Sequence, residues 1–177
     1  MQSIVPVGEL MISTDTGAEL VTVVGSCVAV TLYDPVLKVG GMVHIVLPSS
    51  RHPHENSDRP SFYADTGIEA LITALEKHDA DPARLEACVA GGSSTLPDTD
   101  IGKRNTTAVL SIIEKKLIPL TLVETGGSRG RKMTFALETG QCRVRLVHPS
   151  QTPENTGLPD FSPDADTPLG AGNDSSS

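Results

Sequence analysis

The chain has 177 residues, of which 38% are hydrophobic, and this is enough apolar material for one globular domain with its own core. Its formal net charge of −8 argues against DNA or RNA as a partner, because no basic stripe is present to displace counterions from phosphates. Aromatic residues make up only 3% of the chain, so aliphatic side chains must fill the core.

The first residues, the length of the apolar segments and the cysteines predict the cellular compartment of the protein. The first nine residues lack a basic leader followed by an apolar stretch, and no window of about 18 consecutive apolar residues could cross a bilayer. We therefore expect a cytoplasmic protein. The odd number of cysteines, Cys27, Cys88 and Cys142, without metal-type spacing disfavours a disulfide framework. At least one of them should serve as a thiol.

Apolar runs predict the strands of the N-terminal half. Strands are expected over 4–13, 19–24, 27–33 and 39–47, and the last two should form a hairpin because the turn signal Asp34-Pro35 lies between them. The polar segment that follows, 48–61, predicts an exposed loop.

The predicted hairpin brings two reactive residue types together. If it is centred between Pro35 and the next residue, Cys27 and His44 lie directly opposite each other, with Cβ atoms about 4.5 to 5.5 Å apart. A bulge at Gly40 and Gly41 would slip this register by one residue, so the facing pair is a hypothesis.

Two helices are expected in the second half. The first should cover 66–78, because Thr66 and Glu69 have the spacing of a capping box and apolar residues recur on one face. The second should cover 105–117, closed by Pro119. The remaining strands are predicted over 85–89, 121–124, 133–137 and 142–146. The segments 102–104 and 126–131 do not continue as phosphate-binding loops, so they are predicted as turns whose arginines face solvent.

The order of these elements predicts the fold class and the domain boundary. Strands, a helix, a strand, a helix and further strands without strict alternation indicate an α+β fold, with a β-sandwich or mixed sheet flanked by two main helices. Residues 1–149 should form this single domain. Residues 150–177 contain five acidic residues, no Lys or Arg and few apolar residues, and this composition predicts a disordered acidic tail.

Cys27 is the strongest candidate for chemistry. It follows the bend Gly25-Ser26 at the start of a strand, where exposed backbone N–H groups can line an oxyanion pocket. His44 is the candidate base, and Thr22 is the nearest polar group that could fix its tautomer. We expect a thiol open to solvent with a lowered pKa. For each of these residues the plain alternative is a buried structural side chain.

Other groups carry weaker signals. Cys88 and Cys142 lie inside predicted strands and are expected to be small buried side chains. His52 and His54 could suggest zinc, but they lack a spaced set of further ligands. The sequence therefore predicts no metal site and no cofactor.

Six ordered blocks carry a family resemblance. They read VGSCVAV at 24–30, GGMVHIVLP at 40–48, YAD at 63–65, AGGS at 90–93, IGKRN at 101–105 and TGGSRGR at 125–131. In this order they resemble the chemoreceptor glutamine deamidase family, CheD, over about residues 5–146. The tail lies outside the resemblance.

The resemblance implies a fold, an activity and a site. The family fold is similar to that of deamidating bacterial toxins, which are cysteine hydrolases with a β-sandwich flanked by helices. The implied enzyme is a protein-glutamine deamidase that converts glutamines of methyl-accepting chemotaxis receptors to glutamate through a cysteine thioester. Whether it also hydrolyses glutamyl methyl esters stays open. The family set of Cys, His and Thr corresponds to Cys27, His44 and Thr22. In some members the threonine stands at the place of Val21.

The resemblance also implies a partner, and it leaves other readings open. The family binds a CheC-type chemotaxis phosphatase through an aromatic residue in the region that here contains Leu96. One alternative is a cysteine amidase that acts on another substrate. Another is a non-catalytic chemotaxis adaptor that binds a receptor or the phosphatase while its thiol is vestigial.

Overall fold

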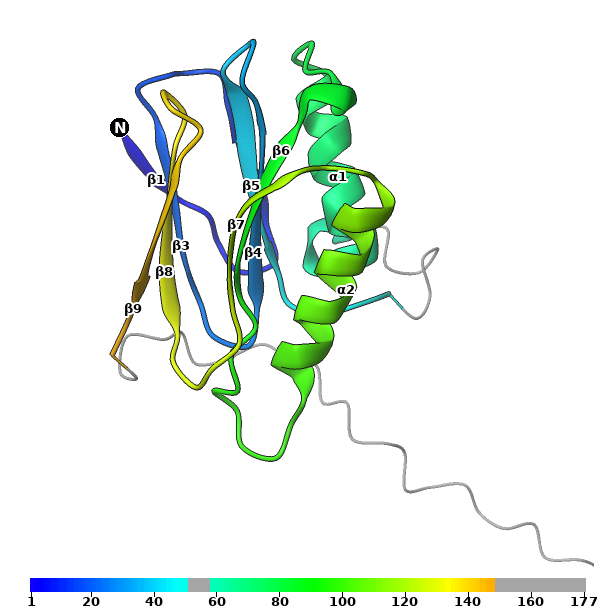
Figure 1. Ribbon diagram of the computed structural model, residues 1–177, viewed down its shortest axis with the longest axis vertical. Coiled ribbons are helices and arrows are strands. Elements are labelled where there is room, and N and C mark those ends of the chain that lie inside the picture. Colours follow the sequence, from blue (N-terminus) through cyan, green and yellow to red (C-terminus); the bar gives the residue numbers. More distant parts are fainter. Residues whose placement is uncertain (51–57, 149–177) are drawn as a thin grey trace, which may run out of the picture.

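The computed structural model describes residues 1–50 and 58–148. Two β-sheets stack face to face, and two helices cover the outer face of one of them (Figure 1). This confirms the predicted α+β fold with a sandwich flanked by two helices. The predicted acidic tail, 150–177, lies outside the described residues. Within the described part of the chain, no helix is long and apolar enough to cross a membrane.

The sheet beside the helices has five strands and is mixed. In spatial order its strands are β2 (Leu10–Ser13), β5 (Val39–Ile45), β4 (Val28–Asp34), β6 (Glu86–Gly91) and β7 (Leu120–Thr125). Only the β6–β7 pair is parallel. Every residue of β4 and β5 is buried, because the helices cover one face of these strands and the second sheet covers the other.

The second sheet has four strands, in the order β1 (Gln2–Ile4), β3 (Glu19–Val24), β8 (Arg131–Ala136) and β9 (Cys142–Leu146). The predicted single strand over 4–13 is therefore wrong, since β1 and β2 belong to different sheets. Pro6 lacks an N–H, and Gly8 has a φ of 74° with the Phe62 ring 2.6 Å from where a Cβ would stand, so the chain turns here and crosses between layers.

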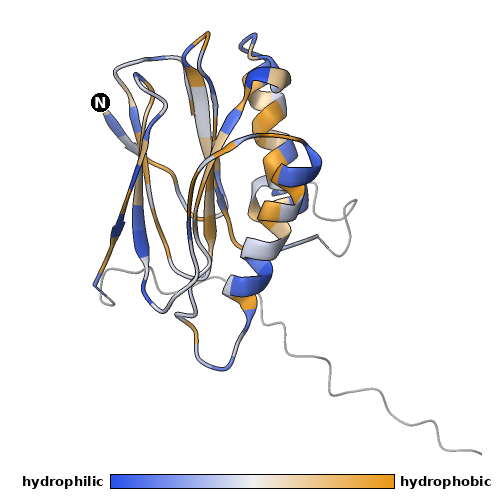
Figure 2. Cartoon of the chain, viewed as in Figure 1, coloured by the Kyte–Doolittle hydropathy of each residue, from blue (hydrophilic) through white to orange (hydrophobic). Residues whose placement is uncertain are grey.

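Both helices begin earlier than predicted. Helix α1 covers Ala64–Glu76, and the proposed capping box is wrong because Thr66 lies inside the helix, where its hydroxyl donates to Pro60 O (2.6 Å). Asp65 occupies the first turn instead, and its carboxylate accepts from the backbone N–H of Ser50. Short 3₁₀ turns occupy Pro60–Phe62 and Pro82–Arg84. Figure 2 shows hydrophobic residues along the helices and along the strands that they cover.

Helix α2 covers Ile101–Lys115, so the segment 102–104, predicted as a turn, is its first turn. Gly102 explains the early start. A Cβ at this position would lie 2.8 Å from the backbone of Gly92, and only glycine lets the helix approach that chain. The start of α2 is thereby held against the end of β6.

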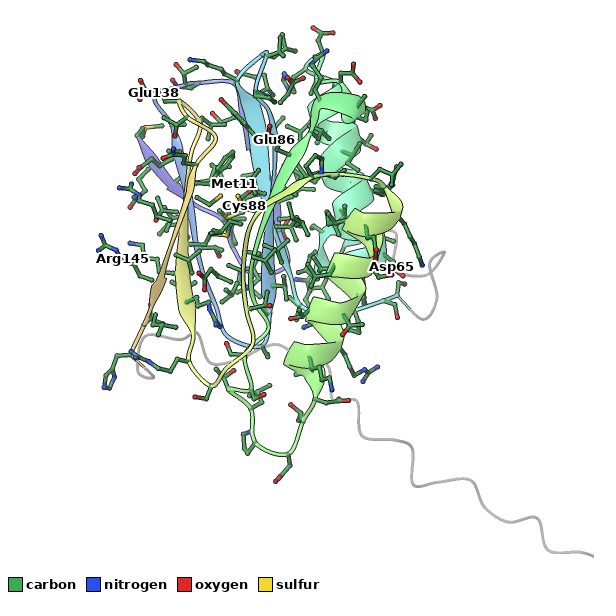
Figure 3. All side chains as sticks on the ribbon, in the orientation of Figure 1. Met11, Asp65, Glu86, Cys88, Glu138 and Arg145 are labelled. Carbon is green, nitrogen blue, oxygen red and sulfur yellow. The ribbon has the colours of Figure 1, made fainter. Side chains whose placement is uncertain are left out.

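The core has two parts, one on each face of the five-stranded sheet. The helix side contains Val28, Val30, Val43 and Ile45, and the inter-sheet side contains Cys27, Ala29, Met42 and Val46. Side chains alternate along a strand, so His44 lies on the inter-sheet side with Cys27. In Figure 3 Met11 and Cys88 mark this inter-sheet layer.

The β4–β5 hairpin has a different register from the one predicted. The pairs run from Asp34↔Val39 to Val28↔Ile45, so Cys27 is not opposite His44, whose partner is Ala29. The pairing is regular through both glycines, and no bulge occurs there. The turn is four residues long because the buried Asp34 carboxylate accepts from the N–H groups of the second and third turn residues (3.0 and 3.3 Å).

Candidate active site

The observed hairpin register differs from the predicted one by two residues, and a shift of two leaves each side chain on the same face of the sheet. Cys27 and His44 are therefore diagonal neighbours on the inter-sheet side. Diagonal neighbours in an antiparallel pair are about 7 to 8 Å apart at the backbone and somewhat closer at Cβ. The structure places the two side chains on the same face of the sheet, though not as the facing pair that the sequence suggested.

The histidine is oriented by the opposite sheet. His44 Nδ1 lies 2.8 Å from Thr22 Oγ1, and the same hydroxyl donates to Val5 O (3.0 Å). A hydroxyl has one proton, so Thr22 must accept from Nδ1–H, and this assigns the tautomer from the hydrogen-bond network. Nε2 is then the unprotonated nitrogen. It is buried, and no described residue hydrogen-bonds to it.

Strand alternation separates Thr22 from Val21. Thr22 reaches His44 across the space between the sheets, so the side chain of Val21 turns to the other face of β3. The structure thus places a hydroxyl against the imidazole from position 22.

Burial keeps both candidate reactive groups neutral. It raises the pKa of the Cys27 thiol to about 12, an effect partly offset by its own backbone N–H, and it lowers the pKa of His44 to about 4. Only 7% of Cys27 and 1% of His44 are exposed. The expected solvent-open thiol with a lowered pKa is therefore wrong for this closed structure. The resting pair is a thiol and a neutral imidazole.

The loop that carries Cys27 is fixed by its carbonyl groups. Gly25 O accepts from both the N–H and the hydroxyl of Ser93 (2.9 and 3.0 Å), and Cys27 O accepts from Gly92 N (2.8 Å). Ser26 O accepts from the Asn105 side chain (3.0 Å). In the described residues, the N–H groups of Ser26 and Cys27 donate to no other backbone carbonyl. These two groups are therefore the candidate oxyanion donors of the loop.

Glycine at the end of β6 makes this packing feasible. Gly91 has a φ of 119°, and a Cβ there would collide with Cys27 O.

The hydroxyl of Ser93 also accepts from Arg131 (3.4 Å), which donates to Gly126 O (2.6 Å) and is 8% exposed. The prediction that the arginines of 126–131 face solvent is thus wrong for Arg131.

Comparison with known proteins identifies the family. The family model described as CheD chemotactic sensory transduction matches residues 46–146. A Thermotoga maritima protein named chemoreceptor glutamine deamidase CheD is 39% identical over 149 residues, which are 83% of this chain and 93% of that protein. The chain belongs to the CheD family. A Symbiobacterium thermophilum relative, named probable chemoreceptor glutamine deamidase CheD, is 41% identical over 81% of this chain and 91% of its own.

Two further points bound these comparisons. The region matched by the CheD model begins at Val46, so it contains neither Cys27 nor His44. A solved structure of the hypothetical protein YfiH from Bacillus licheniformis aligns with a TM-score of 0.41 and 16% identity, over 65% of this chain and 49% of that one.

The other cysteines of this CheD chain lie apart from the candidate site. Cys88 and Thr31 are paired across β4 and β6, and Thr31 Oγ1 lies 3.4 Å from Cys142 Sγ, so the two thiols share one inter-sheet cluster. A hydrogen bond from Cys142 lowers the pKa of Cys88. Among the described residues no group of three or more His, Cys, Asp or Glu could hold a metal. His52 and His54 lie outside them.

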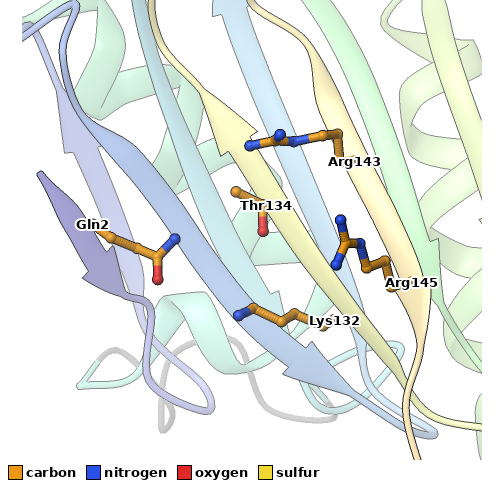
Figure 4. A pocket seen from close by; sticks show the side chains of 5 residues that line it. All are labelled: Gln2, Lys132, Thr134, Arg143 and Arg145. Atoms are coloured by element: carbon orange, nitrogen blue, oxygen red, sulfur yellow. The ribbon is translucent and has the colours of Figure 1, made fainter.

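A cavity of about 170 Å³ lies on the outer face of the four-stranded sheet (Figure 4). Lys132 and Arg145 line it as direct cross-strand neighbours, and Arg143, also at its wall, pairs with Glu19 (2.8 Å). Thr22 and His44 meet on the inner side of this sheet. The cavity is therefore separate from the candidate site.

The residues that sequence reasoning missed come from distant segments. Three residues hydrogen-bond to the Cys27 loop or to Thr22, and they are Asn105, Ser93 and Val5. No spacing in the sequence predicts these bonds. Ser93 and Asn105 belong to the family blocks at 90–93 and 101–105, and Val5 belongs to none of the six blocks. Leu96 is half-buried in the segment between β6 and α2.

Proposed function

We propose that this protein hydrolyses the side-chain carboxamide of selected glutamines in methyl-accepting chemotaxis receptors, giving glutamate. Membership of the CheD family and the names of its relatives support the reaction and the substrate. The proposed place of action is the cytoplasm. The observation that carries the proposal is the unprotonated, unpartnered Nε2 of His44 on the same face of the sheet as Cys27.

The proposed first half-reaction forms a thioester. Nε2 of His44 takes the thiol proton of Cys27, and the sulfur attacks the carboxamide carbon of the substrate. The N–H groups of Ser26 and Cys27 stabilise the tetrahedral oxyanion. The imidazolium then gives its proton to the departing nitrogen, and ammonia leaves. Thr22 holds Nδ1–H throughout, so Nε2 is the nitrogen that accepts and returns the proton.

The second half-reaction uses the same groups with water. Nε2 takes a proton from a water molecule that attacks the thioester carbonyl, and the Cys27 sulfur leaves and recovers the proton. A glutamyl methyl ester would form the same thioester with methanol as the leaving group. The reaction requires no metal ion or nucleotide.

The burial of Cys27 and His44 indicates that the site must change its conformation before the reaction. A thiol with a pKa of about 12 and an imidazole with a pKa of about 4 strongly disfavour proton transfer at rest. Receptor binding must therefore expose Cys27 and hydrate or replace its apolar surroundings before attack. Without this opening the protein would act only as an adaptor. The burial of the Cys27 sulfur is the observation that favours this second function.

A CheC-type phosphatase is proposed as a second partner. Its contact would include Leu96, which follows the segment that fixes Gly25 and is half-buried at the surface. Binding there would act on the Cys27 loop through Ser93.

The test compares substrates side by side. Free glutamine, a short amide and a receptor cytoplasmic fragment are each incubated with the protein, and ammonia and the mass of receptor glutamines are measured. We expect turnover of the receptor fragment alone. Equal turnover of the short amide would favour the general cysteine amidase, and receptor binding without ammonia would favour the adaptor.

A further inference from the structure

One buried amide joins the two segments that carry the candidate nucleophile and base. Asn105, in the second turn of α2, is 0% exposed. Its Nδ2 donates to Ser26 O (3.0 Å) and to Val46 O (2.9 Å). The first carbonyl belongs to the residue before Cys27, and the second lies two residues after His44.

The bridge formed by Asn105 lies where the backbone pairing between β4 and β5 ends. The β4–β5 pairs end at Val28↔Ile45. Beyond that point Val46 N donates to Phe62 O (2.9 Å), and Cys27 O accepts from Gly92, the residue after β6, rather than from β5. Within the described residues, the Asn105 amide is the hydrogen-bonding group that spans the two diverging chains.

The other end of the same side chain is unsatisfied. Asn105 Oδ1 is buried and has no hydrogen-bond partner among the described residues. A buried acceptor without a donor is unfavourable, and asparagine is a weak helix former. Both features work against stability and thus indicate that the position serves the site.

We propose that Asn105 is a positioning residue for the reaction of Cys27. Its two N–H groups hold the loop 25–27 against the end of β5, so that the sulfur stays on the face that presents Nε2 of His44. The inference rests on the proposed function for its turnover measurement, but the bridge itself can be tested without a receptor.

The decisive variant is Asn105→Asp, which keeps the shape and removes both N–H donors, so that at most the one O–H of a protonated carboxyl remains to face the two carbonyls. We expect kcat on a receptor fragment to fall about 100-fold with KM nearly unchanged, because misplacing a reacting group costs turnover rather than affinity. We also expect iodoacetamide to alkylate Cys27 faster at about pH 8, since the released loop exposes the sulfur. Thr106→Ala is the matched control, because among the described residues its hydroxyl bonds only to Gly102 O in the same helix. This control should behave as wild type in both assays.

Two results would overturn the proposal in folded Asn105→Asp protein. One is a kcat within about threefold of wild type, and the other is a loss of kcat with an unchanged alkylation rate and pH profile. If the variant does not fold, the NMR spectrum of the wild-type protein is the test. Slow exchange of the Asn105 side-chain amide protons, and a change of their chemical shift when Cys27 is alkylated, support the bridge. Fast exchange of these protons overturns it. Failure of the proposed function would instead appear as wild-type protein without deamidation.

Discussion

The hydroxyl oxygen of Thr22 lies 2.8 Å from Nδ1 of His44, and this contact joins the two sheets of the sandwich. Thr22 comes from β3 of the four-stranded sheet and His44 from β5 of the five-stranded sheet. Because the threonine proton goes to Val5 O, the contact fixes Nδ1–H and leaves Nε2 unprotonated. The sandwich thus holds the imidazole in one tautomer.

Removing this contact should reduce turnover. We expect Thr22→Ala to lower kcat for receptor deamidation about 100-fold, because the imidazole loses its fixed orientation, while Thr22→Ser should retain most of the activity. Steady-state ammonia release measures both. The double variant Thr22→Ala, Val21→Thr is the control, since position 21 faces the other side of β3. Recovery of activity in the double variant would assign the third role to position 21.

Acid should destabilise the protein through His44. Its pKa is 6.5 when unperturbed and about 4 in the folded state, so the unfolded chain binds an extra proton between these values. Stability is therefore full above pH 6.5 and falls as pH decreases, by about 3 kcal/mol from this group once pH reaches about 4. Urea unfolding at several pH values measures the slope. His44→Gln should flatten the curve in this window, and an unchanged slope would contradict the buried neutral imidazole.

The thiol of Cys27 should react slowly in the free protein. Burial raises its pKa to about 12, so little thiolate exists at neutral pH, and the side chain is 7% exposed. Alkylation by iodoacetamide, followed residue by residue by mass spectrometry, should show Cys27 reacting only slowly at about pH 7. Addition of a receptor fragment should change that rate. Rapid labelling at neutral pH without receptor would show that the site is open at rest.

The turn of the β4–β5 hairpin should contribute to stability but not to chemistry. Asp34 is 0% exposed, and Arg84 lies 2.6 Å away and holds the pKa of its carboxyl well below the usual range. Asp34→Ala removes the turn hydrogen bonds, and we expect a loss of about 2 kcal/mol in the free energy of unfolding. Activity per folded molecule should stay at the wild-type value. A variant that is fully stable but inactive would instead assign Asp34 a role in the reaction.

The element pattern was predictable from the sequence, because apolar periodicity alone identifies most strands and both helices. The hairpin register was not. It depends on Asp34 stabilising a four-residue turn, and no local pattern distinguishes this turn from a tighter one centred on Pro35. Even so, Cys27 and His44 remained on one face, because the error was an even number of residues.

The support around the candidate site could not be predicted in the same way. Asn105 is 79 positions from Ser26, and Ser93 is 68 positions from Gly25, so these bonds arise only when the chain is folded. The burial of Cys27 is also a tertiary property. It results from the second sheet and from the close approach of Gly91, and neither can be derived from the flanking residues of the thiol.

The most direct test of the account is deamidation of a receptor cytoplasmic fragment by wild type, Cys27→Ala and Cys88→Ala proteins, with ammonia as the readout. Cys88 is the matched control because it is a buried thiol between the same two sheets. We expect ammonia release by wild type and by Cys88→Ala, and none by folded Cys27→Ala. Release by Cys27→Ala at the wild-type rate would contradict the assignment of Cys27 as nucleophile.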